Sequence, residues 1–261
     1  MKKPLIHPTA IIHSKAKLGK GVSVGPFSTI GENVSIGDFG EIGTHVSIEG
    51  PTGIGSHCKV FPFASIGHPP QDLKYSGGLT SLKIGNYNTF REFVTIHRGT
   101  EHGGGVTSIG DHNYFMAYAH VAHDCCLGNH IILGNAATLA GHVTIGDYAT
   151  VGAFSGVHQF CRVGPHGFVG GYSVITRDVL PYSRTVSERG THAYGVNSLG
   201  LKRRGLSAEA IEQLHHAFHV LLAEKLNTSQ ALGKLRIEEN LSEEVKVLID
   251  FVESSERGVI K

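Results

Sequence analysis

A hydrophobic residue recurs at every sixth position along most of this chain. The period runs without a break from Ile6 to Ile66, and after two interruptions it continues from Ile109 to Ile175. Glycine often follows these positions and accounts for 35 of the 261 residues. A period of six matches neither the 3.6-residue turn of a helix nor the two-residue alternation of an ordinary strand.

The repeat instead predicts a solenoid whose triangular coil takes three hexapeptides, or about 18 residues. The hydrophobic residue of each hexapeptide points inward and stacks on its equivalent one coil away, while glycine and small residues occupy the corners. This pattern is typical of a left-handed parallel β-helix, the hexapeptide-repeat fold, and covers residues 5 to about 178. We therefore predict a mainly β protein.

A change of period marks the end of the solenoid. The repeat stops in residues 176–184, where Pro181 closes it, and helical spacing begins at Ser207, a residue type that favours the start of a helix. We expect amphipathic helices at 207–225, 228–240 and 242–256. The predicted domains are a β-helix at 1–190, interrupted by loops at 67–83 and 97–105, and a small α-helical C-terminal domain at 191–261.

Composition excludes several classes of function. With 23 Lys and Arg against 22 Asp and Glu, the chain has no overall field to bind nucleic acid. It contains no apolar run long enough to cross a membrane. Its four cysteines show no CxxC spacing. We expect a soluble cytoplasmic protein with reduced thiols and no cofactor.

The stretch MAYAHVAHDCC at 116–126 carries the candidate chemistry. His123 is followed by Asp124, and an imidazole beside a carboxylate is a common general base at neutral pH. Residues one coil apart lie above one another, which puts Gly141 above His123. The same spacing gathers four histidines on one edge of the solenoid: His120, His123, His142 and His158.

Both interruptions leave the solenoid at or close to that edge, and long loops in a compact repeat are usually functional. The other corner histidines, such as His45, His57 and His130, are expected to cap backbone carbonyls. The convergence of two loops and four histidines predicts a functional site.

Acyl transfer suits this combination of groups. His123 would deprotonate a hydroxyl or amine, Asp124 would orient it, and the Gly141 N–H would donate to the developing oxyanion. Transfer is expected to be direct, because no serine or cysteine has a recognisable nucleophile setting. Cys125 and Cys126 are nucleophiles in principle, but adjacent corner cysteines are more often small buried apolar residues.

Two other classes are alternatives. His120, His123 and His142 could hold a catalytic zinc, as in hexapeptide-repeat proteins resembling the gamma-class carbonic anhydrases, although the loops and helical tail have no use in a hydratase. A purely structural or ice-binding solenoid would need a flat, regular threonine face, which the varied loops argue against.

Several stretches carry a resemblance to a known family. They are QDLKY (71–75), TIHRGT (95–100), AHVAHDC (119–125), ATLAGHV (137–143), VHQFC (157–161) and GVNSLGLKRRG (195–205). At these residues, and over most of its length, the chain resembles the UDP-N-acetylglucosamine O-acyltransferases of lipid A biosynthesis. The resemblance implies transfer of a 3-hydroxyacyl chain from acyl carrier protein to UDP-N-acetylglucosamine by a homotrimer with active sites between subunits.

The resemblance also implies roles for individual residues. His123 would be the general base for the sugar 3-hydroxyl, Asp124 its partner, and Gly141 the oxyanion donor. Substrate would contact Asp72, Lys74, His120, His142, His158, Gln159, Gly171, Asn197, Arg203 and Arg204. Among these, Gly171 would lie at the far end of the acyl groove, where glycine leaves room for a longer chain.

Two departures from the family pattern concern the acceptor. Leu199 stands where the family usually has a glutamate, and the stretch SERGTHA at 187–193 differs from the usual one. Both touch sugar or nucleotide contacts, so N-acylation of a 3-amino sugar nucleotide is the alternative reaction. The related N-acyltransferase has an extra N-terminal domain that is missing here, which places O-acylation first.

Overall fold

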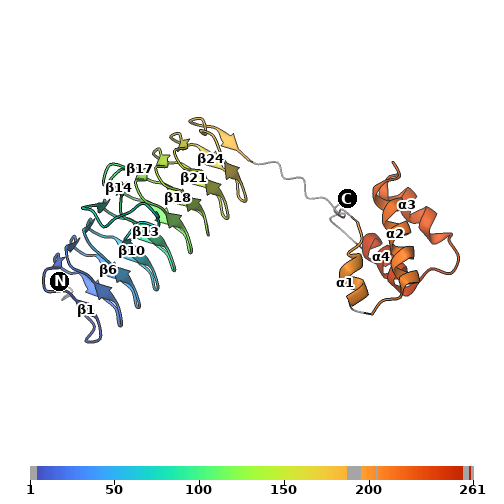
Figure 1. Cartoon of the computed structure of the whole chain (residues 1–261), viewed down its shortest axis with the longest axis horizontal. Coiled ribbons are helices and arrows are strands. Elements are labelled where there is room, and N and C mark those ends of the chain that lie inside the picture. The colour runs from blue at the N-terminus through green and yellow to red at the C-terminus, as the bar shows by residue number, and fades with distance from the viewer. Residues whose placement is uncertain (1–4, 187–194, 204, 255–258, 260–261) are drawn as a thin grey trace. The chain divides into compact units, whose positions relative to one another are not determined.

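The computed structural model describes residues 5–186, 195–203, 205–254 and 259. The chain divides into two compact units, residues 1–187 and residues 188–261 (Figure 1). The first unit is built of short strands and the second of helices. The predicted fold class, a left-handed parallel β-helix followed by α-helices, is confirmed.

Three parallel sheets form the β-helix within the described residues. Sheet 1 contains β1 (Ile11–Ile12), β4 (Thr29–Ile30), β7 (Ser47–Ile48), β10 (Ser65–His68), β13 (Thr95–His97), β16 (His120–Val121), β19 (Thr138–Leu139), β22 (Gly156–Val157) and β25 (Val174–Ile175). Sheet 2 contains β2 (Lys17–Leu18), β5 (Val34–Ile36), β8 (Thr52–Ile54), β11 (Ser81–Ile84), β14 (Val106–Ile109), β17 (Cys126–Leu127), β20 (Thr144–Ile145) and β23 (Arg162–Val163). Sheet 3 contains β3 (Ser23–Val24), β6 (Glu41–Ile42), β9 (Lys59–Val60), β12 (Thr89–Phe90), β15 (Tyr114–Phe115), β18 (Ile132–Leu133), β21 (Thr150–Val151), β24 (Phe168–Val169) and β26 (Arg184–Thr185).

The hexapeptide positions form the core of this unit. Val121, for example, pairs with Leu139 one coil on, and both side chains are inaccessible to solvent. Each strand is too short to be stable alone, so the fold depends on this stacking of buried side chains, each worth about 1.5–3 kcal/mol.

Corner residues adopt a left-handed backbone conformation and form ladders of stacked rings. His57 stacks on Tyr87 with ring centroids 4.7 Å apart, and His130 stacks on Tyr148 at 4.6 Å. His45 stacks on Phe63 in the same way. The expectation that these three histidines cap backbone carbonyls is therefore wrong: their rings pack on aromatic neighbours one coil away.

The solenoid also extends further than the hexapeptide pattern predicted. Val179 bridges to Val163, and β26 pairs Arg184 with Phe168, so another strand follows Pro181. The pairing partners here are closer in sequence than elsewhere, because the final coil is shorter. A shortened coil breaks the six-residue phase without ending the fold.

The second unit contains α1 (Ser198–Arg203), α2 (Ala208–Leu222), α3 (Thr228–Arg236) and α4 (Glu243–Glu253). Ser207, Asn227 and Ser242 each accept a backbone N–H from the first turn of the helix that follows. The three predicted helices exist but end earlier than expected, and α1 was not predicted. Among the described residues no helix is long and apolar enough to cross a membrane.

Candidate active site

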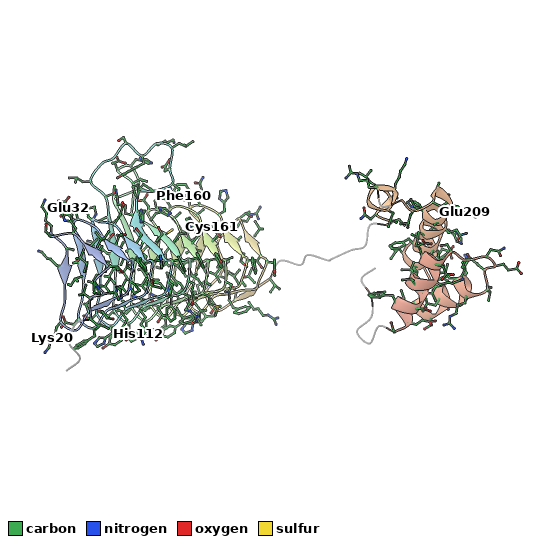
Figure 2. All side chains as sticks on the ribbon, turned by 90° about the horizontal axis from the view of Figure 1, so that it is seen from below. Lys20, Glu32, His112, Phe160, Cys161 and Glu209 are labelled. Atoms are coloured by element: carbon green, nitrogen blue, oxygen red, sulfur yellow. The ribbon has the colours of Figure 1, made fainter. Side chains whose placement is uncertain are left out.

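One corner of the β-helix, between sheets 1 and 2, carries both long loops. The first loop joins β10 to β11, and the second joins β13 to β14. Ile66 pairs directly with Ile96, and Ile96 with Val121, so the coils continue in register beneath the loops. The predicted meeting of both loops at the edge that holds His123 is confirmed, and they project together from the β-helix (Figure 2).

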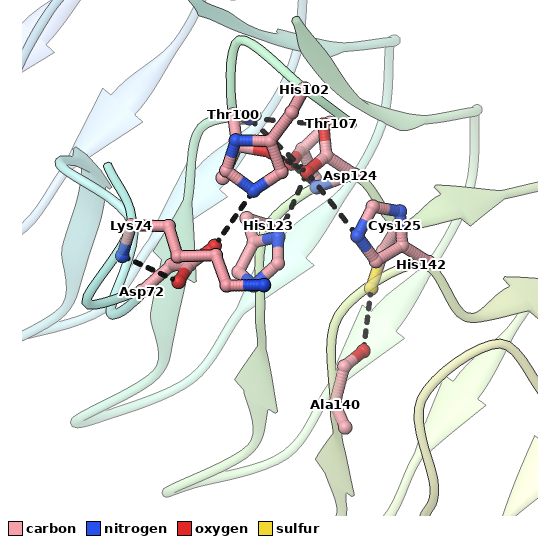
Figure 3. Close-up of polar contacts among 10 residues, drawn as sticks. All are labelled: Asp72, Lys74, Thr100, His102, Thr107, His123, Asp124, Cys125, Ala140 and His142. Atoms are coloured by element: carbon pink, nitrogen blue, oxygen red, sulfur yellow. Dashed lines mark hydrogen bonds and ion pairs between the residues drawn. The ribbon is translucent and has the colours of Figure 1, made fainter. Parts of the chain in front are cut away.

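His123 and Asp124 form a tight pair at this corner (Figure 3). The His123 Nδ1 lies 2.8 Å from Asp124 Oδ2. A carboxylate only accepts hydrogen bonds, so Nδ1 carries the proton and Nε2 carries the free lone pair. The carboxylate is 1% exposed and the imidazole 15%, so the base reaches solvent while its partner does not.

The second loop encloses the Asp124 carboxylate. The Thr100 hydroxyl donates to Oδ2 at 2.6 Å, and the Thr100 N–H donates to Oδ1 at 3.0 Å. The Asp124 N–H in turn donates to Thr107 Oγ1 at 2.8 Å. Gly103 must lack a side chain, because a Cβ there would lie 2.1 Å from Oδ2. These contacts hold a buried charge in one orientation.

Gly141 lies against the face of His123, as the 18-residue spacing predicted. A Cβ on Gly141 would lie 2.5 Å from His123 Cε1. Within the described part of the chain, the Gly141 N–H has no acceptor, whereas its carbonyl accepts from the Phe160 N–H at 3.2 Å. Glycine is thus required for the close approach, and its N–H is available to a ligand beside the base.

A pocket of about 540 Å³ opens in front of the pair. Its lining residues are Gln71, Asp72, Leu73, Lys74, His102, His123, His142, Gln159 and Phe160. The structure therefore brings five of the residues singled out from the sequence to one cavity. They are Asp72, Lys74, His123, His142 and Gln159.

Residues of the two loops hold Asp72 at the pocket wall. The Lys74 N–H donates to its carboxylate at 2.9 Å, and His102 Nε2 lies 3.0 Å from Oδ2. The Lys74 N–H, and then His102, lower the pKa of Asp72 from its ordinary value. Arg98 fastens the loop by donating to the Gly67 carbonyl at 2.9 Å and to the Tyr75 hydroxyl at 3.3 Å.

His142 lies one coil above Asp124 and completes the polar wall. Its Nε2 is 3.9 Å from Asp124 Oδ2, and its ring stacks on Phe160 with centroids 4.5 Å apart. His142 therefore adds another imidazole to the same pocket.

Three other residues singled out from the sequence lie on the β-helix outside the pocket lining. His120 is on β16, where its Nδ1 lies 2.7 Å from Thr95 Oγ1. His158 follows β22 and is exposed. Gly171 occupies the corner between sheets 3 and 1, at the opposite border of sheet 1 from His123.

The remaining residues that were singled out from the sequence lie in the helical unit or just before it. Asn197 accepts the Gly200 N–H at 3.2 Å and so begins α1, and Arg203 ends the same helix with an exposed side chain. Leu199 is 62% exposed on α1. Arg204 and the altered stretch at 187–193 lie outside the described residues.

The group of metal-binding donors differs from the one expected. Donor atoms of His123, Asp124 and His142 lie within 4.8 Å of one another, whereas His120 is not part of that group. Asp124 Oδ2 already accepts from the Thr100 hydroxyl and from His123 Nδ1. A metal would have to compete with both bonds.

Neither adjacent cysteine lines the pocket. Burial raises the pKa of Cys125 to about 12, so the group stays a thiol, and its side chain is inaccessible to solvent. Cys126 is exposed on β17 of sheet 2. A covalent intermediate on Cys125 is therefore excluded by burial and charge state.

Sequence reasoning missed Thr100, His102 and Arg98 as parts of the site. Thr100 and Arg98 belong to the stretch TIHRGT, which did signal the family. His102 had no signal, because the loops interrupt the 18-residue spacing.

Known proteins resemble this chain over nearly its whole length. A protein of Halorhodospira halophila named acyl-[acyl-carrier-protein]–UDP-N-acetylglucosamine O-acyltransferase is 48% identical over 98% of this chain and 99% of its own length. The chain belongs to the UDP-N-acetylglucosamine O-acyltransferase family. The family model described as UDP N-acetylglucosamine O-acyltransferase, domain 2, matches residues 178–260.

Other members of the O-acyltransferase family show the same likeness. The correspondingly named protein of Thiobacillus denitrificans is 47% identical over 98% of this chain and 99% of its own. A crystal structure of the UDP-N-acetylglucosamine acyltransferase of Bacteroides fragilis is 42% identical, with a TM-score of 0.68, over 98% of this chain and all of that one.

Replacing Thr100 by valine is expected to weaken the His123–Asp124 pair without removing it. The substitution deletes the hydroxyl that donates to Oδ2 and leaves the backbone N–H in place, so we expect about a tenfold loss of kcat and about 1.5–3 kcal/mol of stability. Steady-state kinetics and urea unfolding measure both effects. Thr100→Ser retains the hydroxyl and is the control; an equal loss in that variant would contradict the hydrogen-bond explanation.

His120 predicts a pH dependence of stability. Burial, and next the nearby His97 and His123, lower the pKa of His120 from 6.5 to about 4. The folded protein therefore resists protonation, and the contribution of His120 is complete above pH 6.5 and lost as the pH falls toward 4. After allowance for its partial exposure, the free energy of unfolding should fall by about 2 kcal/mol. Urea unfolding of His120→Gln should show a smaller fall in the free energy of unfolding as the pH is lowered from 6.5 toward 4. A fall as large as that of the wild type would contradict this assignment.

Proposed function

We propose that this protein transfers a 3-hydroxyacyl chain from acyl carrier protein to the 3-hydroxyl of UDP-N-acetylglucosamine, the first step of lipid A biosynthesis. The observation that carries the proposal is the His123–Asp124 pair, 2.8 Å apart, at the wall of a pocket beside the Gly141 N–H. The names of relatives 45–48% identical over at least 98% of this chain support the two substrates.

The proposed reaction is direct transfer. His123 Nε2 removes the proton from the sugar 3-hydroxyl, and the oxygen attacks the thioester carbonyl of the acyl carrier. The Gly141 N–H stabilises the negative charge on the carbonyl oxygen. The tetrahedral intermediate then collapses to the ester, and the carrier thiol leaves with the proton that His123 held. Asp124 keeps the imidazole in the tautomer that the first step needs and supports its positive charge.

The other residues are proposed to bind substrate. Asp72, Lys74, His142 and Gln159 line the pocket and would hold the sugar nucleotide. His120 and His158 would support the site from sheet 1, and Gly171 would end the acyl groove at the opposite border of that sheet. Asn197, Arg203 and Arg204 would contact the diphosphate, because arginine pairs well with phosphate oxygens.

We further propose that the enzyme is a cytoplasmic homotrimer with active sites between subunits. The pocket is open in the single chain, and Leu73 on its wall is fully exposed. A neighbouring subunit would cover such an apolar side chain. Equilibrium sedimentation gives the mass of the assembly, and a monomer that retains full activity would contradict the arrangement.

One assay decides whether the enzyme catalyses O-acylation or N-acylation. UDP-N-acetylglucosamine and its 3-amino analogue are offered side by side with 3-hydroxyacyl carrier proteins of several chain lengths, and the products are identified by mass and by sensitivity to mild base. We expect the ester product to form with the higher kcat/KM. A higher kcat/KM for the amide would favour the 3-amino acceptor, with Leu199 among the residues responsible.

A zinc-dependent hydratase is the second candidate, favoured by the clustered donors of His123, Asp124 and His142. Zinc bound there would supply an activated water. Metal analysis and assays with a chelator separate the candidates. We expect acyl transfer to persist in the chelator; loss of activity with the chelator, restored by stoichiometric zinc, would overturn the metal-free mechanism.

A further inference from the structure

The buried Cys125 side chain contacts the backbone one coil above it. Its Sγ lies 3.2 Å from the Ala140 carbonyl oxygen (Figure 3). The thiol is inaccessible to solvent, so this carbonyl points toward the interior of the β-helix. The following residue is Gly141, which lies against His123.

The Ala140 carbonyl and the Gly141 N–H belong to one planar peptide unit. In a trans peptide these two groups point in opposite directions. A carbonyl directed inward therefore directs the Gly141 N–H outward, away from the core. Neighbouring backbone groups are fixed as well, since the Ala140 N–H donates to Val157 and the His142 N–H donates to the His123 carbonyl.

We propose that Cys125 is a positioning residue that orients and polarises the Ala140–Gly141 peptide, so that the Gly141 N–H serves as the oxyanion donor. A hydrogen bond to a carbonyl draws electron density from the peptide nitrogen and makes its N–H a stronger donor. The inference rests on the proposed acyl transfer and adds a role for a thiol that takes no covalent part in it.

The state of the thiol fits this role. Burial raises the pKa of Cys125 to about 12, so the S–H proton is present throughout the working pH range. A thiol is a weak donor, but a buried one has no water to compete with its acceptor.

The same kind of contact recurs at other corners of the β-helix. Cys58 donates to the Gly85 carbonyl at 3.2 Å, and Ser155 donates to the Gly170 carbonyl at 2.8 Å. Neither contact lies in the pocket. Cys58 therefore offers a matched control for loss of a thiol, and Ser155 shows that a hydroxyl fits such a position.

The test compares kcat and KM of Cys125→Ala, Cys125→Ser and Cys58→Ala with the wild type. We expect Cys125→Ala to lose about tenfold in kcat, with little change in the KM for the acyl carrier protein or for UDP-N-acetylglucosamine. The reason is that polarisation of the Ala140–Gly141 peptide stabilises the transition state. Cys125→Ser should restore kcat, and Cys58→Ala should lose stability but not kcat. Cys125→Val fills the thiol's space without a donor and gives the same comparison where the alanine variant does not fold.

Either of two results with the Cys125 variants would overturn the inference without overturning the proposed function: an undiminished kcat in both the alanine and valine variants, or no gain in kcat on changing alanine to serine. An equal loss of kcat in Cys58→Ala would also overturn it, because the effect would then be one of stability. A wild-type protein that transfers no acyl group would overturn the proposed function, and this inference with it.

Discussion

The His123→Ala variant is expected to lose acyl transfer by about 10³-fold or more in kcat while the β-helix stays folded. The imidazole lies against Gly141, and a positioned general base contributes about 10²–10⁴-fold. Its ring is partly exposed at a corner, so its removal leaves the buried hexapeptide core unchanged. Single-turnover assays with labelled acyl carrier protein measure the loss, and circular dichroism reports the fold.

His130→Ala is the matched control for this change. His130 is also a corner histidine, but it stacks between His112 and Tyr148 on another corner of the β-helix. Losing that stacking should cost about 1 kcal/mol of stability and leave kcat at the wild-type value. A His123→Ala enzyme no slower than His130→Ala would contradict the assigned mechanism.

Asp124→Asn is expected to lower kcat by about 10³-fold with a similar fold. The buried carboxylate accepts from His123 and twice from Thr100, whereas an amide would turn its NH₂ group toward one of these donors. His123 then loses both its orientation and the negative charge that supports its protonated form. Steady-state kinetics measure the loss, and urea unfolding measures the accompanying destabilisation.

Asp147→Asn provides the comparison for this second variant. Asp147 is a corner carboxylate that accepts the Asn129 N–H at 2.7 Å, outside the pocket. Its replacement should keep kcat within about twofold. Equal kcat values for the two variants would mean that Asp124 only supports the fold.

The sequence alone predicted the fold because one rule is repeated many times. Each hexapeptide places a hydrophobic residue inward, so the coil length follows from the period, and with it the stacking of Gly141 on His123. Any pair of residues within uninterrupted coils could be placed in this way. That is why the spacing placed His142 beside His123, and both line the pocket, whereas His120 and His158, which the same spacing gathered, lie outside its lining.

The 18-residue spacing no longer predicts which residues lie close together where the repeat is interrupted. Thr100 and His102 belong to the second loop, and their positions depend on contacts with Asp124 and Asp72 that no period encodes. Residue type also misleads at corners. His45 and His130 looked like capping groups, but the left-handed corner backbone places their rings in register with aromatic residues one coil away.

The helical unit shows a different limit. The helix cap at Ser207 was evident from the sequence, and its side chain accepts the expected backbone N–H. The short α1 has no comparable period, so it was missed, although Asn197 begins it. The proposed contact of Arg203 with a nucleotide depends on the three-dimensional position of this helix, which local sequence patterns do not specify.

Rescue of His123→Ala by added imidazole tests the central claim most directly. The pocket of about 540 Å³ has room for a free imidazole where the side chain stood. If His123 is the general base for attack by UDP-N-acetylglucosamine, the rate of ester formation should rise with imidazole and follow its unprotonated form as the pH is varied. A rate that follows imidazolium instead, or that does not respond to imidazole, would contradict the account.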